Sequence, residues 1–409
     1  MTPSFNRLLL TTCLLVASPT VASAQEQPFL RGRYVEVTAR DQPDYNPQSI
    51  RSGAFIITSS IGLSARQTDN VFAVADKRDS DTAVHITPRF EANSDWTTHE
   101  LSVGGWIDHR EYLNFKEENA TDYNVFATGR IDATRDVQLR LGADYGHFTE
   151  ERYAAASFGA SEPASFDKAS VFAQAVMSND RFRIEGVVGA SSDRYDQIIQ
   201  RLRDNNTTYL NARMSYAISP DIAVFLQGRQ AELDYTANNR DGSQTTIDAG
   251  VNFELAAPFR GEVAVGNFTD DRKSPLFGDI EGLNVRGNLK WFPTELTTLT
   301  FLANRGLIDP GLPVSASAVN TAFGVRVDHE LLRNLLLFGD LRQESNSYEG
   351  SSIDREDSAV SFSAGGAYKM NRNMHLEFQL LSRSQESSGA DAGPDINVNV
   401  ISAGLRFFP

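Results

Sequence analysis

Apolar and polar positions alternate along most of this chain, from residue 53 to the C-terminus. In the segment 283–291, for example, Leu283 and Val285 alternate with Asn284 and Arg286. Successive side chains of a β-strand point to opposite faces, so a period of two predicts strands with one apolar and one polar face. The pattern therefore indicates an all-β domain.

The segments that connect these strands alternate between short and long. Short turns such as Asn179-Asp180 and Pro293-Thr-Glu295 are followed by longer polar stretches such as 152–165 and 271–279, whose residue types are typical of turns and solvated loops. Counting both kinds predicts about eighteen strands, with sixteen as the alternative. The expected strands are 53–68, 81–94, 99–113, 123–134, 137–151, 166–178, 181–196, 206–218, 222–236, 244–256, 259–270, 280–292, 297–308, 316–330, 335–345, 358–370, 374–384 and 396–408.

An even number of antiparallel strands with short turns at one end and long loops at the other is typical of a transmembrane outer-membrane β-barrel. Hydrocarbon offers no hydrogen-bond partner, so a membrane-spanning sheet has to close on itself. Aromatic residues lie at both expected interfaces, with Trp291 and Phe292 near the short turns and Tyr123 and Tyr195 near the long loops. A soluble propeller or sandwich is the competing fold, but it does not predict connections of two lengths.

The first residues have the three parts of a secretory signal. Arg7 is basic, residues 8–17 are apolar, and Ala22-Ser-Ala24 resembles a cleavage site. We therefore expect a cleaved signal peptide at 1–24, a periplasmic arm at 25–52 with an extended, proline-containing sequence, and the barrel at 53–409. The expected location is the outer membrane of a Gram-negative cell.

Composition narrows the possible chemistry. The formal net charge of −15 argues against nucleic acid as a partner. The single cysteine, Cys13, lies in the expected signal, and the six histidines are scattered over different segments without the spacing of metal ligands. We find no serine-hydrolase elbow and no phosphate-binding glycine loop, so we expect no catalytic residues, no metal, no cofactor and no enzyme activity.

The polar faces of the strands carry a set of basic residues. If the apolar faces contact lipid, these residues face the lumen together with acidic ones such as Asp328 and Glu377. They could form a wall of self-neutralising ion pairs, or an arginine-lined path for anions or acidic sugar polymers. The candidates are Arg130, Arg140, Arg183, Arg213, Arg286, Lys290, Arg326 and Arg383.

Two stretches carry a resemblance to a known family. The segment 40–55, which reads RDQPDYNPQSIRSGAF, followed by Thr68-Asp-Asn-Val-Phe72, resembles the opening of the putative β-barrel porin 2 family of outer-membrane proteins. Gln48-Ser49 and Thr68 depart from the usual pattern. The resemblance implies an outer-membrane barrel, and some relatives are thought to act beside exopolysaccharide export machinery, which implies periplasmic export components as partners.

Further expectations concern the ends of the barrel. We expect Asp69 and Asn70 to end the first crossing and begin the first outer loop, with a calcium site as the alternative. The last strand, 402–409, resembles the motif that barrel-assembly machinery reads. Outer-membrane lipid and lipopolysaccharide are the other expected partners.

The sequence thus predicts a porin-like channel for hydrophilic solutes, and the resemblance adds a conduit for exopolysaccharide export. The alternatives are a non-conducting anchor or adhesin, and an outer-membrane barrel enzyme that acts on lipid or polysaccharide. The channel and the anchor differ in whether the lumen conducts.

Overall fold

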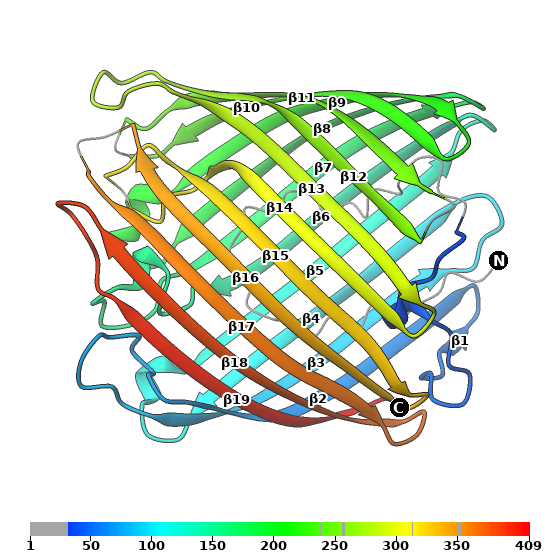
Figure 1. Ribbon diagram of the computed structural model, residues 1–409, viewed down its shortest axis with the longest axis horizontal. Helices are drawn as coiled ribbons and strands as arrows, with labels where there is room; N and C mark the ends of the chain where they lie inside the picture. The colour runs from blue at the N-terminus through cyan, green and yellow to red at the C-terminus, as the bar shows by residue number, and fades with distance from the viewer. Residues whose placement is uncertain (1–31, 238, 256–257, 313, 351–352) are drawn as a thin grey trace.

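The protein is described by a computed structural model that covers residues 32–409 except 238, 256–257, 313 and 351–352. Eighteen long antiparallel strands form a closed barrel, which is seen from the side in Figure 1. A short strand, β1 (Ile50–Ser52), pairs with the start of β2 in a tight hairpin. The barrel strands are β2 (Phe55–Thr68), β3 (Asp81–Ser94), β4 (Glu100–Tyr112), β5 (Ala120–Asp132), β6 (Val137–Thr149), β7 (Ser165–Ser178), β8 (Phe182–Tyr195), β9 (Asn205–Ser219), β10 (Ile222–Tyr235), β11 (Gly242–Glu254), β12 (Phe259–Arg272), β13 (Ile280–Thr294), β14 (Thr297–Ile308), β15 (Ser317–Leu332), β16 (Leu335–Glu349), β17 (Glu356–Lys369), β18 (Met374–Ser388) and β19 (Ile396–Phe407).

Closure joins the last strand to the first. β19 pairs with β2 from Val400↔Thr68 to Phe407↔Ile61, so the sheet has no open edge at this point. The prediction of an eighteen-stranded antiparallel barrel is confirmed. The largest differences are at the loop ends of β16 and β18, where each strand continues four residues past its predicted limit. These added residues are polar, so their pairing cannot be recognised from apolar alternation.

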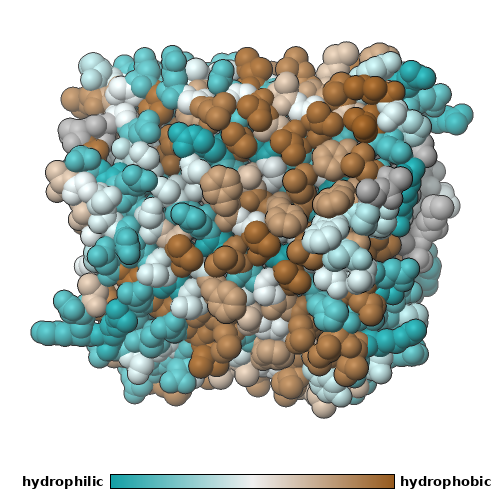
Figure 2. Space-filling model, in the orientation of Figure 1, coloured by the Kyte–Doolittle hydropathy of each residue, from teal (hydrophilic) through white to brown (hydrophobic). Residues whose placement is uncertain are grey.

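The two faces of the wall differ as the alternation predicts. On β9, Leu210 and Met214 are 53% and 52% exposed, whereas Arg213, on the opposite face, is 6% exposed. Brown, hydrophobic side chains gather over the middle of the barrel surface in Figure 2, and teal, hydrophilic ones dominate its left and right ends. This apolar belt is the surface that hydrocarbon covers in a membrane barrel. Separately, none of the helices in the described ranges has the length and apolar character of a membrane span.

Within the described residues, the helical content is limited to four single turns: η1 (Val37–Ala39), η2 (Lys116–Glu118), η3 (Ala155–Ser157) and η4 (Gln200–Arg203). Of these, η1 belongs to the expected periplasmic arm, and the others lie in the long loops. The predicted signal peptide at 1–24, Cys13 and the start of the arm at 25–31 lie outside the described residues.

Two small apolar clusters form at the loop end of the barrel. One contains Phe268, Phe277, Ile280, Ala316 and Val319. The other joins Ala73 of the first loop to Ile396, Val398 and Val400 of β19, and Tyr153 and Phe158 of the β6–β7 loop pack against it. The long loops therefore fold onto the barrel and cover part of its mouth.

Candidate functional site: the lumen and its two mouths

An ion-pair cluster occupies the inner wall at β9, β12 and β13. Arg213 donates from Nη1 and Nη2 to the two carboxylate oxygens of Glu262, at 3.1 and 2.7 Å. Its guanidinium lies 3.6 Å from the centre of the Phe225 ring. Arg286 lies 3.5 Å from the same carboxylate and donates to Gln227 at 3.0 Å. One glutamate thus compensates two of the predicted arginines.

Five of the other six predicted basic residues also lie beside acidic groups. Arg130 contacts Glu100 at 2.7 Å, Arg183 contacts Glu185 at 3.6 Å, Lys290 contacts Glu36 at 2.5 Å, Arg326 contacts Asp328 at 2.8 Å, and Arg383 contacts Glu344 at 2.7 Å. Arg140 stands in register with Arg130 on the neighbouring strand. These contacts favour the self-neutralising wall over a row of uncompensated arginines.

The β6–β7 loop reaches the far wall of the barrel. Tyr153 of this loop lies under the guanidinium of Arg383 on β18, 4.5 Å from ring centre to Cζ, and Phe158 lies 5.4 Å from Arg355. Arg152 anchors the base of the loop through two charge-assisted hydrogen bonds to Glu118, one of them at 2.8 Å from Nε. The loop therefore passes across the outer mouth and narrows it.

A buried arginine ties three loops together beside this crossing. Arg203 Nη2 donates to Glu150 at 2.9 Å and to Asp309 at 2.8 Å, and its guanidinium stacks on Tyr195 at 4.3 Å. Burial alone would raise the pKa of Asp309, but the positive charges of Arg203 and Arg240 outweigh it and lower this pKa to about 2. The network therefore links the β6–β7, β8–β9 and β14–β15 loops through one charged group.

Residues 33–46 belong to the expected periplasmic arm and lie along the rim of the periplasmic mouth; from here on, 'the arm' means these residues. Arg33 contacts Asp221 at 2.7 Å at the β9–β10 turn, and Gln42 accepts a hydrogen bond from Lys369 on β17 at 2.5 Å. Between these ends, Glu36 contacts Arg260 and Lys290, and the Val37 amide donates to Thr298 Oγ1 at 3.0 Å. In Figure 1 the dark-blue start of the described chain lies at the right-hand end of the barrel, near the C-terminus. The arm follows the rim from β10 to β18.

Sequence reasoning did not name the contacts of the loop or of the arm. It expected residues 152–165 to be a solvated outer loop and residues 25–52 to be an extended periplasmic arm. The rings of Tyr153 and Phe158 indicate that this loop packs against something, but they do not identify the partner.

The Asp69-Asn70 pair closes the barrel seam. Strand β2 ends at Thr68, as predicted. Asp69 accepts hydrogen bonds from the backbone and side-chain nitrogens of Asn399 on β19, both at 2.7 Å. Asn70 is buried and bonds to Val74 and to the carbonyl of Asn397. These partners assign the pair a structural role and favour it over calcium; among the described residues no cluster of three or more acidic, histidine or cysteine side chains could hold a metal ion.

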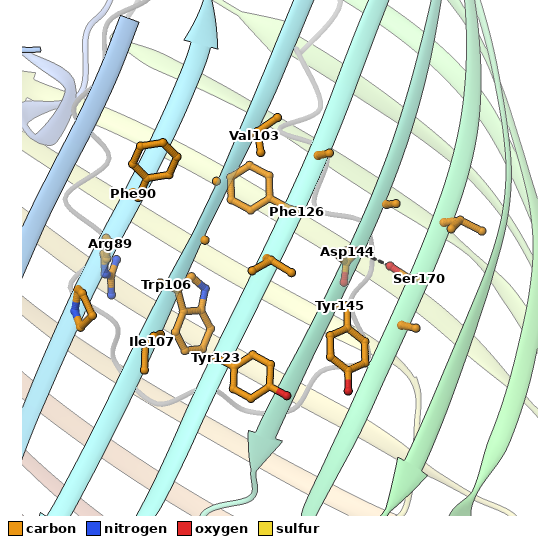
Figure 3. Close-up of a pocket in the computed structure, with 18 residues that line it drawn as sticks. Arg89, Phe90, Val103, Trp106, Ile107, Tyr123, Phe126, Asp144, Tyr145 and Ser170 are labelled. Atoms are coloured by element: carbon orange, nitrogen blue, oxygen red, sulfur yellow. Dashed lines mark hydrogen bonds between the residues drawn. The ribbon is translucent and has the colours of Figure 1, made fainter. Parts of the chain in front are cut away.

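A groove of about 820 Å³ lies on the lipid-facing side of β3 to β7. Its lining includes outward-facing Phe90, Val103, Ile107 and Tyr145, which are labelled in Figure 3. Inward residues of the same strands form hydrogen bonds on the other face, as between Asp144 and Ser170. The groove is thus part of the outer surface and does not belong to the solute path.

The barrel resembles solved structures of outer-membrane proteins. No curated protein matches the chain. The solved structure of the outer membrane protein OpdK from Pseudomonas aeruginosa is similar, with 12% identity, a TM-score of 0.49, and coverage of 86% of this chain and 99% of that one. OccK2 (OpdF) from the same organism, solved in complex with glucuronate, has 10% identity, a TM-score of 0.49, and coverage of 86% and 98%. The FrpB iron transporter from Neisseria meningitidis has 7% identity, a TM-score of 0.47, and coverage of 86% and 81%.

The family comparison covers nearly the whole barrel. Residues 42–408 match the family described as "Putative beta-barrel porin 2". This range begins in the arm and ends in the last strand, so it includes every barrel strand and the seam. The chain therefore belongs to the putative beta-barrel porin 2 family and is a porin-like barrel of the outer membrane.

Proposed function

We propose that the barrel is a passive channel for small hydrophilic solutes and catalyses no reaction. The observation that carries the proposal is the polar inner wall, which extends from Lys290 and Glu36 at the periplasmic mouth to Arg383 and Glu344 near the outer mouth. Charged side chains line this face, and an eighteen-stranded barrel is wide enough for an aqueous channel. Family membership supports the same assignment.

The mechanism is diffusion through a narrowed, water-filled lumen. Because most of the wall charges are paired, the wall favours ions of neither sign strongly. The β6–β7 loop and the arm limit the size of the solute at the two mouths. The proposed solutes are therefore small and polar, with a weak preference set by the few charges that are not fully compensated.

Planar-bilayer recording of the purified chain tests the proposal. We expect stable single-channel conductance in symmetrical salt and a reversal potential near zero in a salt gradient. Replacing Arg183, Arg213 and Arg286 together with glutamine leaves Glu185 and Glu262 uncompensated and should shift the reversal potential toward cation preference. Unchanged selectivity would remove these arginines from the mechanism.

A non-conducting anchor is the second candidate, because the loop and the arm narrow both mouths of the barrel. It predicts folded protein that inserts into bilayers and passes no current. Export of exopolysaccharide is a further proposal that rests on the family resemblance alone, and it requires that the arm leave the periplasmic mouth to admit a polymer.

A further inference from the structure

Two positive side chains stand directly opposite each other at the periplasmic mouth. Arg260 on β12 and Lys290 on β13 are in register and face the lumen. Like charges directly opposite each other on neighbouring strands are destabilising, so an anion beside the pair stabilises it. The β11 residue in register with Arg260 is Glu254, and its carboxylate accepts the Arg33 backbone amide at 2.8 Å.

The anion beside the pair comes from the arm. Glu36 Oε1 lies 2.7 Å from Arg260 Nη2 and 2.5 Å from Lys290 Nζ. Arg260 Nη1 also donates to the Tyr34 carbonyl at 3.2 Å, and its guanidinium lies 5.3 Å from the Phe292 ring centre. One carboxylate oxygen therefore accepts from both cations, as a bound solute carboxylate would.

The arm is attached by side-chain contacts rather than by strand pairing. These contacts include the ion pair of Arg33 with Asp221 and the hydrogen bond from the Val37 amide to Thr298 Oγ1. The Tyr34 ring also stacks on Phe292, with 5.2 Å between ring centres. The partly exposed Arg33–Asp221 contact contributes about 1 kcal/mol or less, and the buried bond from the Val37 amide to Thr298 contributes about 1 kcal/mol. None of these contacts belongs to the strand pairing, so release of the arm would leave the barrel sheet intact.

We infer that Arg260 and Lys290 form a carboxylate-binding site at the periplasmic mouth, that Glu36 is its resident occupant, and that an acidic solute competes with the arm for it. This inference rests on the proposed channel function, because the solute reaches the site through the lumen. A short tether holds its own group at an effective concentration of roughly millimolar, so competition requires solute at millimolar levels or above. The solute class is a small carboxylate anion.

Trapping of the arm tests the site without measuring current. The printed sequence has one cysteine, Cys13, which the chain without residues 1–24 lacks. In that chain we would introduce Val37→Cys and Thr298→Cys and measure the rate of linkage by a short thiol crosslinker. Glutarate at about ten times its Kd should slow linkage roughly tenfold, and sodium chloride of equal ionic strength should leave the rate unchanged.

Matched variants identify the residues responsible. Glu36→Gln weakens the resident contact, so linkage should be slower even without glutarate. Asp44→Asn removes a carboxylate from the exposed part of the same arm and should behave like the parent. Lys290→Met removes one cation of the site and should abolish the response to glutarate. Heat-modified gel mobility shows that each variant is folded.

The outcomes separate the two proposals. A linkage rate that glutarate does not alter overturns the carboxylate site, and so does a failure of the two cysteines to link in folded protein. A glutarate-sensitive arm in a barrel that carries no current retains the site and overturns the channel. Conductance in a barrel whose arm does not respond to glutarate retains the channel and overturns the site.

Discussion

Replacing Glu262 with glutamine should destabilise the barrel strongly, because it removes the carboxylate that contacts both Arg213 and Arg286. Arg213 is buried, and its two hydrogen bonds to Glu262 are 3.1 and 2.7 Å long. Glutamine retains one acceptor oxygen but no charge. Leaving a buried charge without its partner costs about 3–5 kcal/mol. We expect about 3 kcal/mol here, since Arg286 is partly exposed and keeps its hydrogen bond to Gln227.

A double-mutant cycle isolates the pair. Arg213→Met together with Glu262→Gln removes both charges, so the double variant should be more stable than the sum of the single losses predicts, by about 2 kcal/mol. The assay is urea unfolding of the barrel in lipid vesicles, with the folded fraction read from gel mobility. Losses that add to within about 0.5 kcal/mol would refute the argument that this contact is a coupled buried pair.

Three further predictions concern packing, pH and the seam. A Cβ at Gly142 would lie 2.2 Å from the Phe172 ring, whereas one at Gly186 would meet nothing within 4 Å; Gly142→Ala should therefore cost about 1–3 kcal/mol in the same unfolding assay, and Gly186→Ala should change stability by less than about 0.5 kcal/mol. The pKa of Asp309 is lowered from 3.8 to about 2, so its charge should add about 2 kcal/mol to the free energy of unfolding above pH 4, and this is lost as the pH falls through 2. The stability difference between the parent and Asp309→Asn should therefore vanish over that range. A difference that is constant with pH would contradict this assignment. Asn70→Ala removes a buried amide that bonds to Val74 and Asn397, and should cost about 1–3 kcal/mol; hydrogen exchange at the Val74 amide should become faster if that bond protects it.

The barrel strands could be predicted because their cause is local. Each crossing needs alternate apolar side chains, so a segment such as 283–291 shows its two faces in the printed sequence. The polar ends of β16 and β18 were underestimated for the same reason, since pairing beyond the apolar belt leaves no alternation to detect.

The contents of the lumen could not be predicted in the same way. Glu36 and Lys290 are 254 positions apart, and only the path of the arm along the rim brings them together. Likewise, no local pattern indicates that Tyr153 reaches Arg383 on the far wall. The eight basic residues were chosen from strand alternation, which orders side chains along one strand but does not identify the acid beside each of them.

Pairing of β2 with β19 also has a consequence for biogenesis. During synthesis and export, the amide groups on one side of the first barrel strand have no mate until the final segment of the polypeptide has emerged. A chain that lacks this segment therefore has an unpaired strand edge, which is a site of aggregation. Loss of the last dozen residues would remove most of β19 and leave the barrel open along the seam.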